Sequence, residues 1–469
     1  MSSAAELKQN DNLFIHPWDD MAKIGKHERT LLDRGEGVYV YDSDGNRLLD
    51  APAGMWCVNV GHGRQEIAQA VYDQIMALTY VSPWSMTTGP AAEFAAQLAE
   101  LSPGDLNHVF FATGGSTAVD SALRFAHFYN NMRGMPNKKH IISQKRGYHG
   151  STYLGGSVSG KERDKSNLHF ETELVHHIDA PHPLHKPAGI SDADFLDHCV
   201  ANLENMIAEV GAENCAIFVA EPILASGGVI VPPAGYHQRC LEVCRNNDML
   251  YLSDEVVTAF GRLGHCFASE DVFGIVPDII TTAKGLTSGY IPMGAFLVSD
   301  RLIDEIKQKG GDTAVFSNGF TYSGHPVAAA AGIKNLEIMQ REKLFEQARD
   351  TGPYLQQQMQ TLRDIPIVRD VRGMGLMACV ECELIQGKDD LAMDYEIGNL
   401  IDKHCQKLGL IVRPIINMCV MSPPLTITRE QIDDMVSMLR QGILLALEEI
   451  ENAEATSTGA DSRHPSPAA

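Results

Sequence analysis

The sequence predicts an α/β protein whose parallel β-sheet carries helices on both faces, followed by a smaller α+β portion. Short apolar runs alternate with helical patterns between about residues 108 and 299, and this alternation produces βαβ units with parallel strands. From about residue 324 the pattern changes to longer helical segments. Near the N-terminus, alternating apolar and polar residues surround an Asp44–Gly45 turn, which is typical of a hairpin.

The individual elements follow from the same patterns. Helices are expected over 116–129 and 235–248, and in the first of these Val119, Leu123 and Ala126 recur at helical spacing to form a core face. The predicted strands are 108–113, 140–144, 216–223, 249–256, 278–283 and 294–299 in the large sheet, and 375–385 and 409–414 in the smaller portion. We expect the smaller portion to share a sheet with the N-terminal hairpin.

These elements predict an organisation of the chain in four segments. Residues 1–60 should join the small domain, residues 61–324 should form the large domain, and residues 325–451 should form the C-terminal small domain. Residues 452–469 are rich in Ser, Thr, Ala and Pro and have almost no apolar content, so this tail is predicted to be disordered.

Composition excludes several classes of partner. The 469 residues carry a net charge of −22 and no block of basic residues, which argues against nucleic acid and anionic membranes. No run of about 18 apolar residues predicts a membrane-spanning helix, and the N-terminus lacks the pattern of a secretory signal. Ten cysteines scattered through a chain of this size indicate reduced thiols in the cytoplasm.

Three features place chemistry at the carboxyl ends of strands, where ligands bind in parallel sheets. Gly115 and Ser116 open a helix directly after a strand, where backbone N–H groups and the helix dipole favour a phosphate. Asp254 and Glu221 each end an apolar strand, and an acid there is costly unless it is paired. Lys284 ends the strand 278–283, and an amine kept from water has the lowered pKa that a Schiff-base nucleophile needs.

Each feature has an ordinary structural explanation as well. Ser116 could simply cap its helix, a strand-end acid could cap the next helix, and Lys284 could extend to water. The glycine motif is neither a Walker A nor a GxGxxG fingerprint. Together, however, an amine, an acid and a phosphate cradle fit a phosphate-bearing aldehyde cofactor with a ring nitrogen.

With these residues the sequence resembles the class III pyridoxal-phosphate aminotransferases, and within them the ω-transaminases of the amine:pyruvate type. The resemblance covers about residues 37 to 449. It implies fold type I, with a large mixed, mostly parallel sheet domain and a smaller α+β domain, a homodimer or dimer of dimers, and no metal. It rests on the following motifs, which occur in the family's order: MWCVNVGHGRQEI, GYHGST, EPI, SDEVVTAFGR, AKGLTSGYIPMGA, FTYSGHPVAAA, VRP and SPPLTIT.

The resemblance also implies roles for individual residues. Lys284 matches the lysine that binds pyridoxal 5'-phosphate, and Asp254 matches the acid under the pyridine nitrogen. Tyr148 and Val256 match the residues on the two ring faces. The remaining assignments are Gly115 and Ser116 to the phosphate, Thr321 to the phosphate of the neighbouring subunit, Glu221 to the support of the ring's substituents or a nearby Arg, and Trp56 and Arg413 to the substrate pocket.

This chain departs from many relatives at two places. Thr117 replaces an acidic residue after the phosphate serine, with little expected consequence because the backbone binds the phosphate. The segment SPWSM (82–86) replaces a frequent aromatic pair, and its Trp84 is assigned to the substrate pocket. The C-x-x-C of Cys379–Cys382 and the His-rich segment 176–185 are interpreted as structure and not as metal sites.

The expected activity is transfer of an amino group from a primary amine or ω-amino acid to an α-keto acid, with pyruvate as the expected acceptor. Amino-group isomerases and decarboxylases share Lys284 and Asp254, so these residues do not discriminate between the reactions. Trp56 and Arg413 favour a two-substrate transaminase. A binding protein that reuses the fold would be expected to have lost the lysine or the acid, and both are present. The sequence leaves the amine donor open among diamines, aromatic amines, β-alanine and taurine-like sulfonates.

Overall fold

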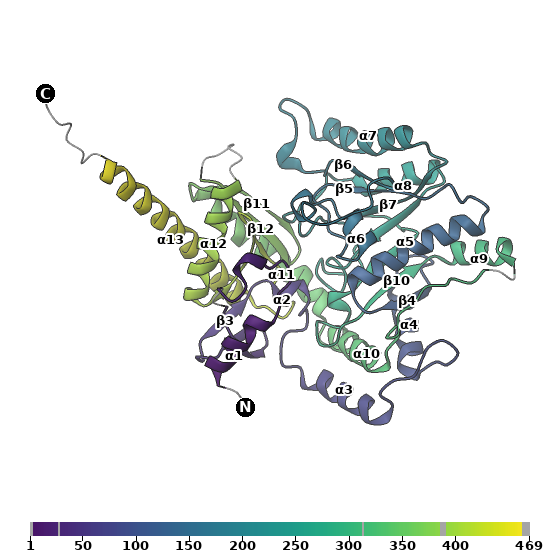
Figure 1. The fold of residues 1–469 in the computed structure, drawn as a ribbon, viewed down its shortest axis with the longest axis horizontal. Helices are drawn as coiled ribbons and strands as arrows, with labels where there is room; N and C mark the ends of the chain where they lie inside the picture. The colour runs from purple at the N-terminus through teal and green to yellow at the C-terminus, as the bar shows by residue number, and fades with distance from the viewer. Residues whose placement is uncertain (1–2, 27–28, 312–313, 385–390, 462–469) are drawn as a thin grey trace.

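The computed structural model describes residues 3–26, 29–311, 314–384 and 391–461, with side chains described as far as residue 453. Figure 1 shows a larger body that contains the seven-stranded sheet, and a smaller body beside it that contains both ends of the described chain. The last helix extends away from the smaller body (Figure 1).

The large sheet has the strand order β4-β10-β9-β8-β7-β5-β6. β10 is antiparallel to both of its neighbours, and all the other pairs are parallel, so the expected mixed, mostly parallel sheet is confirmed. The strands are β4 (His108–Ala112), β5 (His140–Gln144), β6 (Val175–Ile178), β7 (Cys215–Ala220), β8 (Leu250–Asp254), β9 (Ile279–Thr282) and β10 (Gly294–Val298).

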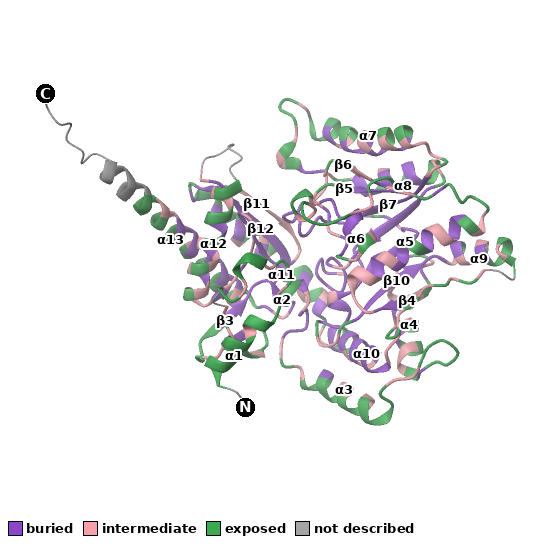
Figure 2. Cartoon of the chain, in the orientation of Figure 1, coloured by how far each residue is buried: buried purple, intermediate pink, exposed green. Residues whose placement is uncertain are grey.

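Helices cover both faces of this sheet because its strands are apolar on both sides. Ile217 and Val219 pack with Val119 and Leu123 of α5, whereas Phe218 packs with the cluster formed by α7 and α8 on the opposite face. Figure 2 shows the central strands as buried. The helices of this part are α3 (Gln65–Ala77), α4 (Gly89–Leu101), α5 (Gly115–Met132), α6 (Tyr153–Val158), α7 (Asp192–Val210), α8 (Tyr236–Asn246), α9 (Asp300–Lys309) and α10 (Pro326–Arg341).

The smaller body contains two four-stranded sheets, ordered β1-β2-β3-β13 and β11-β12-β15-β14. β3 and β13 pair in parallel, Leu49 opposite Leu410, so the N-terminal hairpin shares its sheet with the C-terminal portion as the sequence predicts. The elements are α1 (Ala4–Asn10), β1 (Leu32–Glu36), β2 (Tyr39–Asp42), β3 (Arg47–Asp50), α2 (Ala53–Trp56), α11 (Leu344–Gln360), β11 (Val368–Met374), β12 (Met377–Cys382), α12 (Leu391–Leu408), β13 (Leu410–Ile411), β14 (Arg413–Ile415), β15 (Met418–Met421) and α13 (Arg429–Asp461).

The tail differs from its prediction. α13 continues past residue 452 to Asp461, because the segment NAEA at the start of the predicted tail consists largely of strong helix formers. Residues 462–469 of the predicted tail lie outside the described residues, and the boundaries between the four predicted segments stay predictions. A helix that crosses a membrane needs about 18 mostly apolar residues, and no helix in the described part of the chain meets this requirement.

The direction of the strands decides where a ligand can bind. β4 is antiparallel to β10, which is antiparallel to β9, so β4 runs in the same direction as β9 and the other parallel strands. The carboxyl ends of β4, β5, β7, β8 and β9 therefore meet at one edge of the sheet. All the strand-end groups singled out from the sequence follow one of these five strands.

Candidate active site

A cavity of about 1120 Å³ opens at this edge, between the large sheet and the smaller body. Its wall contains residues that follow the strand ends, together with residues from the smaller body. Nine of the eleven residues predicted for the site line it, namely Trp56, Gly115, Ser116, Tyr148, Glu221, Asp254, Val256, Lys284 and Arg413. Parallel strand ends predicted the grouping of Gly115, Ser116, Glu221, Asp254 and Lys284, and the family resemblance implied the other four residues.

Lys284 follows β9 after one residue and begins a single turn of 3-10 helix, Lys284–Leu286. Its φ of 39° lies in the left-handed region, which a lysine rarely adopts, so the surrounding structure holds it there. Burial lowers the pKa of the Lys284 amine, and the charges of Asp254 and Glu221 only partly oppose this effect. Lys284 Nζ lies 5.7 Å from the ring centroid of Trp56. The amine therefore points into the cavity and does not reach the outside solvent as a snorkelling lysine would.

Asp254 is the last residue of β8, and its carboxylate is buried. Its Oδ2 lies 2.7 Å from Nδ1 of His149, and its Oδ1 accepts a hydrogen bond from the backbone N–H of Val256 at 3.2 Å. Burial opposes protonation of His149, but the hydrogen bond and charge of Asp254 outweigh it and raise the pKa of the imidazole. The pair thus fixes a carboxylate at the floor of the cavity.

Sequence reasoning missed His149. It stands in the motif GYHGST directly after Tyr148, but nothing local in the motif shows that its side chain meets Asp254, more than 100 residues along the chain. Parallel pairing of β5, β7 and β8 brings the two strand ends together.

Glu221 follows β7 and holds the backbone around Tyr148. Its Oε1 accepts from the N–H of Tyr148 at 2.9 Å, and its Oε2 accepts from the N–H of Ala225 at 3.0 Å. Burial raises the pKa of the Glu221 carboxyl, with the charge of His149 opposing it. The Tyr148 hydroxyl lies 2.9 Å from Oγ of Ser151, so backbone and side chain of the tyrosine are both fixed.

The N-terminus of α5 has room for an anion. Its N-cap residue is Gly114, which provides no side-chain cap, so the alternative of a serine-capped helix is wrong here. A Cβ on Gly115 would lie 3.3 Å from Cγ1 of Val256, tighter than most such contacts, which favours glycine at this position. Ser116 Oγ accepts from the N–H of Ser151 at 3.1 Å. The 18-residue helix therefore points an uncapped positive dipole end at the cavity.

The wall formed by the smaller body carries Trp56 and Arg413. The guanidinium carbon of Arg413 lies 5.8 Å from the ring centroid of Trp56, and burial lowers the pKa of Arg413. Nε1 of Trp56 and Nε of Arg413 are buried without a hydrogen-bond partner in the described part of the chain, as are Nε2 of His149 and Oγ of Ser226 in the same wall. Unpaired buried polar atoms around one cavity indicate that a polar ligand completes it.

Three further residues of the wall were not predicted. Trp18 lies 6.1 Å from Tyr148 between ring centroids, and Lys161 and Arg163 also line the cavity. In the sequence, Lys161 and Arg163 belong to the charged run KERDK, which has the composition of a solvated loop. Only the folded chain shows that part of this run turns inward.

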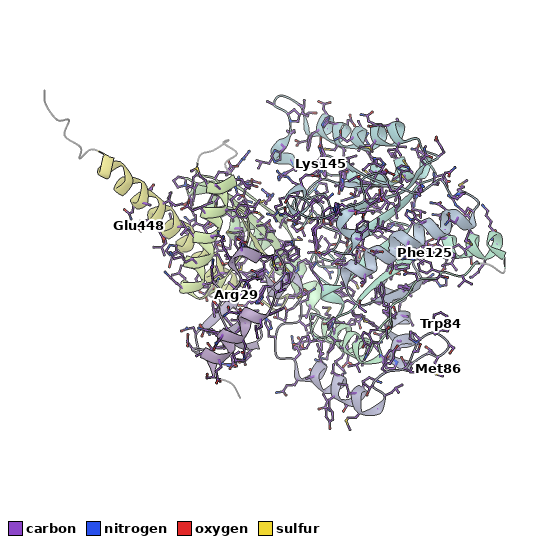
Figure 3. All side chains as sticks on the ribbon, in the orientation of Figure 1. Arg29, Trp84, Met86, Phe125, Lys145 and Glu448 are labelled. Atoms are coloured by element: carbon purple, nitrogen blue, oxygen red, sulfur yellow. The ribbon has the colours of Figure 1, made fainter. Side chains whose placement is uncertain are left out.

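Thr321 and Trp84 are not brought into this cavity. Thr321 is exposed, and its backbone carbonyl accepts a hydrogen bond from the hydroxyl of Tyr80 at 2.5 Å. Trp84 is 95% exposed on the segment between α3 and α4 and does not line this cavity in the single chain, so its place in the substrate pocket stays a prediction. Figure 3 shows Trp84 beside Met86, on a different part of the molecule from Arg29, which lines the cavity. A sequence shows that the segment is apolar, but not which way it projects.

Comparison with known proteins agrees with this geometry. The family model for class III aminotransferases matches residues 21–443. The chain belongs to the class III aminotransferases. It is similar to a putrescine–pyruvate aminotransferase of Pseudomonas aeruginosa, with 40% identity over 91% of this chain and 93% of that one. It is also similar to gamma-aminobutyrate transaminase 1 of Oryza sativa subsp. indica, with 37% identity over 87% and 80% of the two chains.

Solved structures give the same result. The structure of an omega transaminase from Pseudomonas jessenii in complex with PMP superposes with a TM-score of 0.91 at 32% identity, covering 96% of this chain and 99% of that one. The expectations of an aminotransferase, of fold type I and of pyridoxal phosphate as cofactor are confirmed. The uncapped helix, the strand-end amine and the buried carboxylate fit this cofactor. Among the described residues, no cluster of three or more His, Cys, Asp or Glu could hold a metal ion.

Proposed function

We propose that this class III aminotransferase moves an amino group from a primary amine or ω-amino acid to an α-keto acid, with pyruvate as acceptor, in a ping-pong reaction. The observation that carries the proposal is the arrangement of one cavity that contains the Lys284 amine, the Asp254 carboxylate and the unpaired Arg413 guanidinium. A single site with a cation that can bind a carboxylate is suited to two substrates that bind in turn.

The protein's own groups have distinct tasks in this reaction. The N-terminus of α5 at Gly115 and Ser116 would hold the phosphate of the cofactor, and Asp254 would pair with its ring nitrogen. Tyr148 and Val256 would pack on the two faces of the ring. Bound pyridoxal phosphate supplies an aldehyde that takes up the amino group and a ring that accepts the electrons of the deprotonated carbon.

Lys284 is the proposed acid–base group. Its amine would hold the cofactor covalently when no substrate is bound. A lysine amine with its pKa lowered by burial is neutral in a larger fraction of molecules near neutral pH, so it can take the proton from the substrate carbon and later return it.

Asp254 and Glu221 act on the cofactor from fixed positions. The His149 contact at 2.7 Å orients the Asp254 carboxylate and stabilises its charge. Glu221 positions Tyr148 through its backbone N–H, and it thereby supports the packing of the tyrosine on the ring. Both acids are held by hydrogen bonds that do not depend on a substrate.

Arg413 is the proposed carboxylate clamp. A guanidinium presents a planar pair of donors that matches a carboxylate bidentately. In the described part of the chain Arg413 makes no ion pair, so pyruvate and its amino product would supply its partner. An amine without a carboxylate would leave the guanidinium unpaired, so Arg413 would have to swing away from such a donor. Trp56 would form the apolar side of the same pocket.

We also propose that the protein is at least a homodimer. Trp84, Met86 and Tyr322 expose apolar surface, and the Tyr80–Thr321 hydrogen bond ties the two exposed segments together. This surface supports a partner chain there, with Thr321 of each chain reaching the phosphate bound in the other. The ten free cysteines support the expected cytoplasmic location.

The test is a panel of amino donors incubated with pyruvate, in which formation of alanine is measured. Diamines, aromatic amines, β-alanine and taurine form the panel, and Lys284→Ala is the matched inactive control. Alanine formed with at least one donor supports the proposal. Turnover of a donor without any keto acid would contradict it and favour an amino-group isomerase or a decarboxylase.

A further inference from the structure

We propose that Lys161 is a second anion-binding residue of the substrate pocket, which recognises a carboxylate at the end of a substrate remote from the reacting carbon. The inference rests on the proposed transaminase activity and deepens it, because it selects a class of substrate. It favours ω-amino acids and dicarboxylic α-keto acids, and it disfavours diamines.

The backbone fixes the position of Lys161. Two backbone hydrogen bonds join Gly160 to the segment after β5. The N–H of Arg146 donates to the carbonyl of Gly160 at 2.8 Å, and the N–H of Gly160 donates to the carbonyl of Gly147 at 2.9 Å. Gly147 immediately precedes Tyr148. These two backbone hydrogen bonds join segments 13 and 14 residues apart, and they place Lys161 beside the tyrosine.

The side chain extends into the cavity from this anchor. Lys161 Nζ lies 5.3 Å from the ring centroid of Tyr148, and Lys161 lines the same cavity as Lys284 and Arg413. Lys284 and Arg413 instead lie against the ring of Trp56. The cavity thus has the Lys161 ammonium beside Tyr148, in addition to the Lys284 and Arg413 cations beside Trp56.

Lys161 has no acid partner. In the described part of the chain it makes no ion pair within 4.0 Å, and the nearest carboxylate in sequence that lines the cavity, Asp164, is bound to Nε of Arg163 at 3.1 Å. Glu221 is engaged by the backbone of Tyr148 and Ala225. The charged groups that act on Lys161 are two cations, Arg163 and Arg413, and two acids, Asp164 and Glu221. Both acids are already engaged by other donors.

Burial and the charge of Arg163 lower the pKa of Lys161 to about 8, so the side chain carries a positive charge in most molecules at pH 7. A partly desolvated ammonium without a counter-ion attracts an anion more strongly than one in bulk water. An unpaired ammonium in a substrate cavity also repels a second ammonium. Lys161 therefore favours the binding of ω-amino acids and disfavours the binding of diamines.

The test compares substrates that differ only at the remote end. Half-reactions of the holoenzyme are followed by the cofactor's absorbance, with 4-aminobutyrate, butylamine and putrescine as donors and with 2-oxoglutarate and 2-oxopentanoate as acceptors. The variant Lys161→Met keeps the aliphatic stem and removes the charge, and Lys161→Arg restores the charge. Lys145→Met removes a lysine charge from the nearby surface, where Lys145 pairs with Asp179 outside the cavity, and serves as the matched control (Figure 3).

In Lys161→Met we expect kcat/KM for 4-aminobutyrate relative to butylamine to fall roughly 10- to 100-fold, as for loss of a hydrogen bond between charged groups. The ratio of putrescine to butylamine should rise. The acceptor arm shows separately whether the remote carboxylate is read in the keto acid, through a fall in the ratio of 2-oxoglutarate to 2-oxopentanoate. Lys161→Arg should retain most of the preference, and Lys145→Met should change none of these ratios.

Ratios that stay unchanged in both arms, with butylamine turnover intact, would overturn the role of Lys161 and leave the transaminase proposal standing. An equal loss for every substrate, or loss of bound cofactor absorbance, would also overturn it, because Lys161 would then support the cofactor or the fold. If the wild-type enzyme converts no amine with any keto acid, the proposed function itself fails.

Discussion

Replacing Arg413 with alanine should separate the two half-reactions. Arg413 has no internal ion pair in the described part of the chain, so its removal breaks no salt bridge of the free enzyme, and the loss should fall on substrates that carry a carboxylate. A bidentate guanidinium–carboxylate contact consists of two hydrogen bonds between charged groups, each worth about 1.5–3 kcal/mol. Because such bonds are not additive, a total of about 2–4 kcal/mol is realistic, which corresponds to roughly 30- to 1,000-fold in kcat/KM.

The assay is stopped-flow absorbance of each half-reaction. In Arg413→Ala, pyruvate and L-alanine should lose this factor, whereas butylamine should change by less than about tenfold because it offers the guanidinium no partner. Arg413→Lys should recover part of the loss, as a point charge without the planar pair of donors. Arg440→Ala is the matched control. It removes an arginine of α13 that pairs with Asp364, and it should leave both half-reactions unchanged. Equal losses for pyruvate and butylamine would refute the clamp and make Arg413 a scaffold residue. No loss for pyruvate would place the clamp elsewhere.

Four further outcomes are expected. Borohydride should fix the cofactor on Lys284, as peptide mass mapping would show, and a Lys284→Ala protein with wild-type turnover would rule out its role. Asp254→Asn should keep some cofactor but lose several orders of magnitude in rate, and a loss below about tenfold, or 1.4 kcal/mol of barrier, would make the acid structural. Sedimentation at assay concentration should give at least a dimer, and a fully active monomer would contradict the role of Thr321. Raising the pH through about 8 neutralises Lys161, so the preference for 4-aminobutyrate over butylamine should be present below that pH and fall above it. If the ratio of kcat/KM for these two donors does not change between pH 7 and 9, the charge of Lys161 does not set the preference.

The sequence predicted the parts of the site that depend on strand direction. Lys284, Asp254 and Glu221 each follow an apolar run, and parallel strands place such residues at one edge whatever the details of packing. It did not predict His149 against Asp254 or Lys161 beside Tyr148, because those contacts depend on how one strand end lies next to another and on a local backbone pairing at Gly160. The charged run KERDK (161–165) has the composition of a solvated loop, yet its Lys161 lines the cavity.

The direction in which an apolar side chain projects could not be predicted from the sequence either. Trp84 is apolar, and an apolar side chain is compatible with a core position or with an exposed one. Whether such a residue points into its own cavity or outward depends on the path of the segment between α3 and α4, which no periodicity encodes. The same applies to α13, where helix propensity continues the helix beyond the last apolar residue that packs.

The short pairing of β3 with β13 has a consequence for biosynthesis. Leu49 and Leu410 lie about 360 residues apart in the chain, yet their strands directly precede Trp56 and Arg413. Closing so long a loop costs only slightly more entropy than closing a shorter one, but it cannot happen before both ends exist. Once the chain up to residue 298 has left the ribosome, every strand of the large sheet has been synthesised. The wall of the pocket that carries Trp56 and Arg413 therefore forms only later, after residue 413 has been synthesised as well.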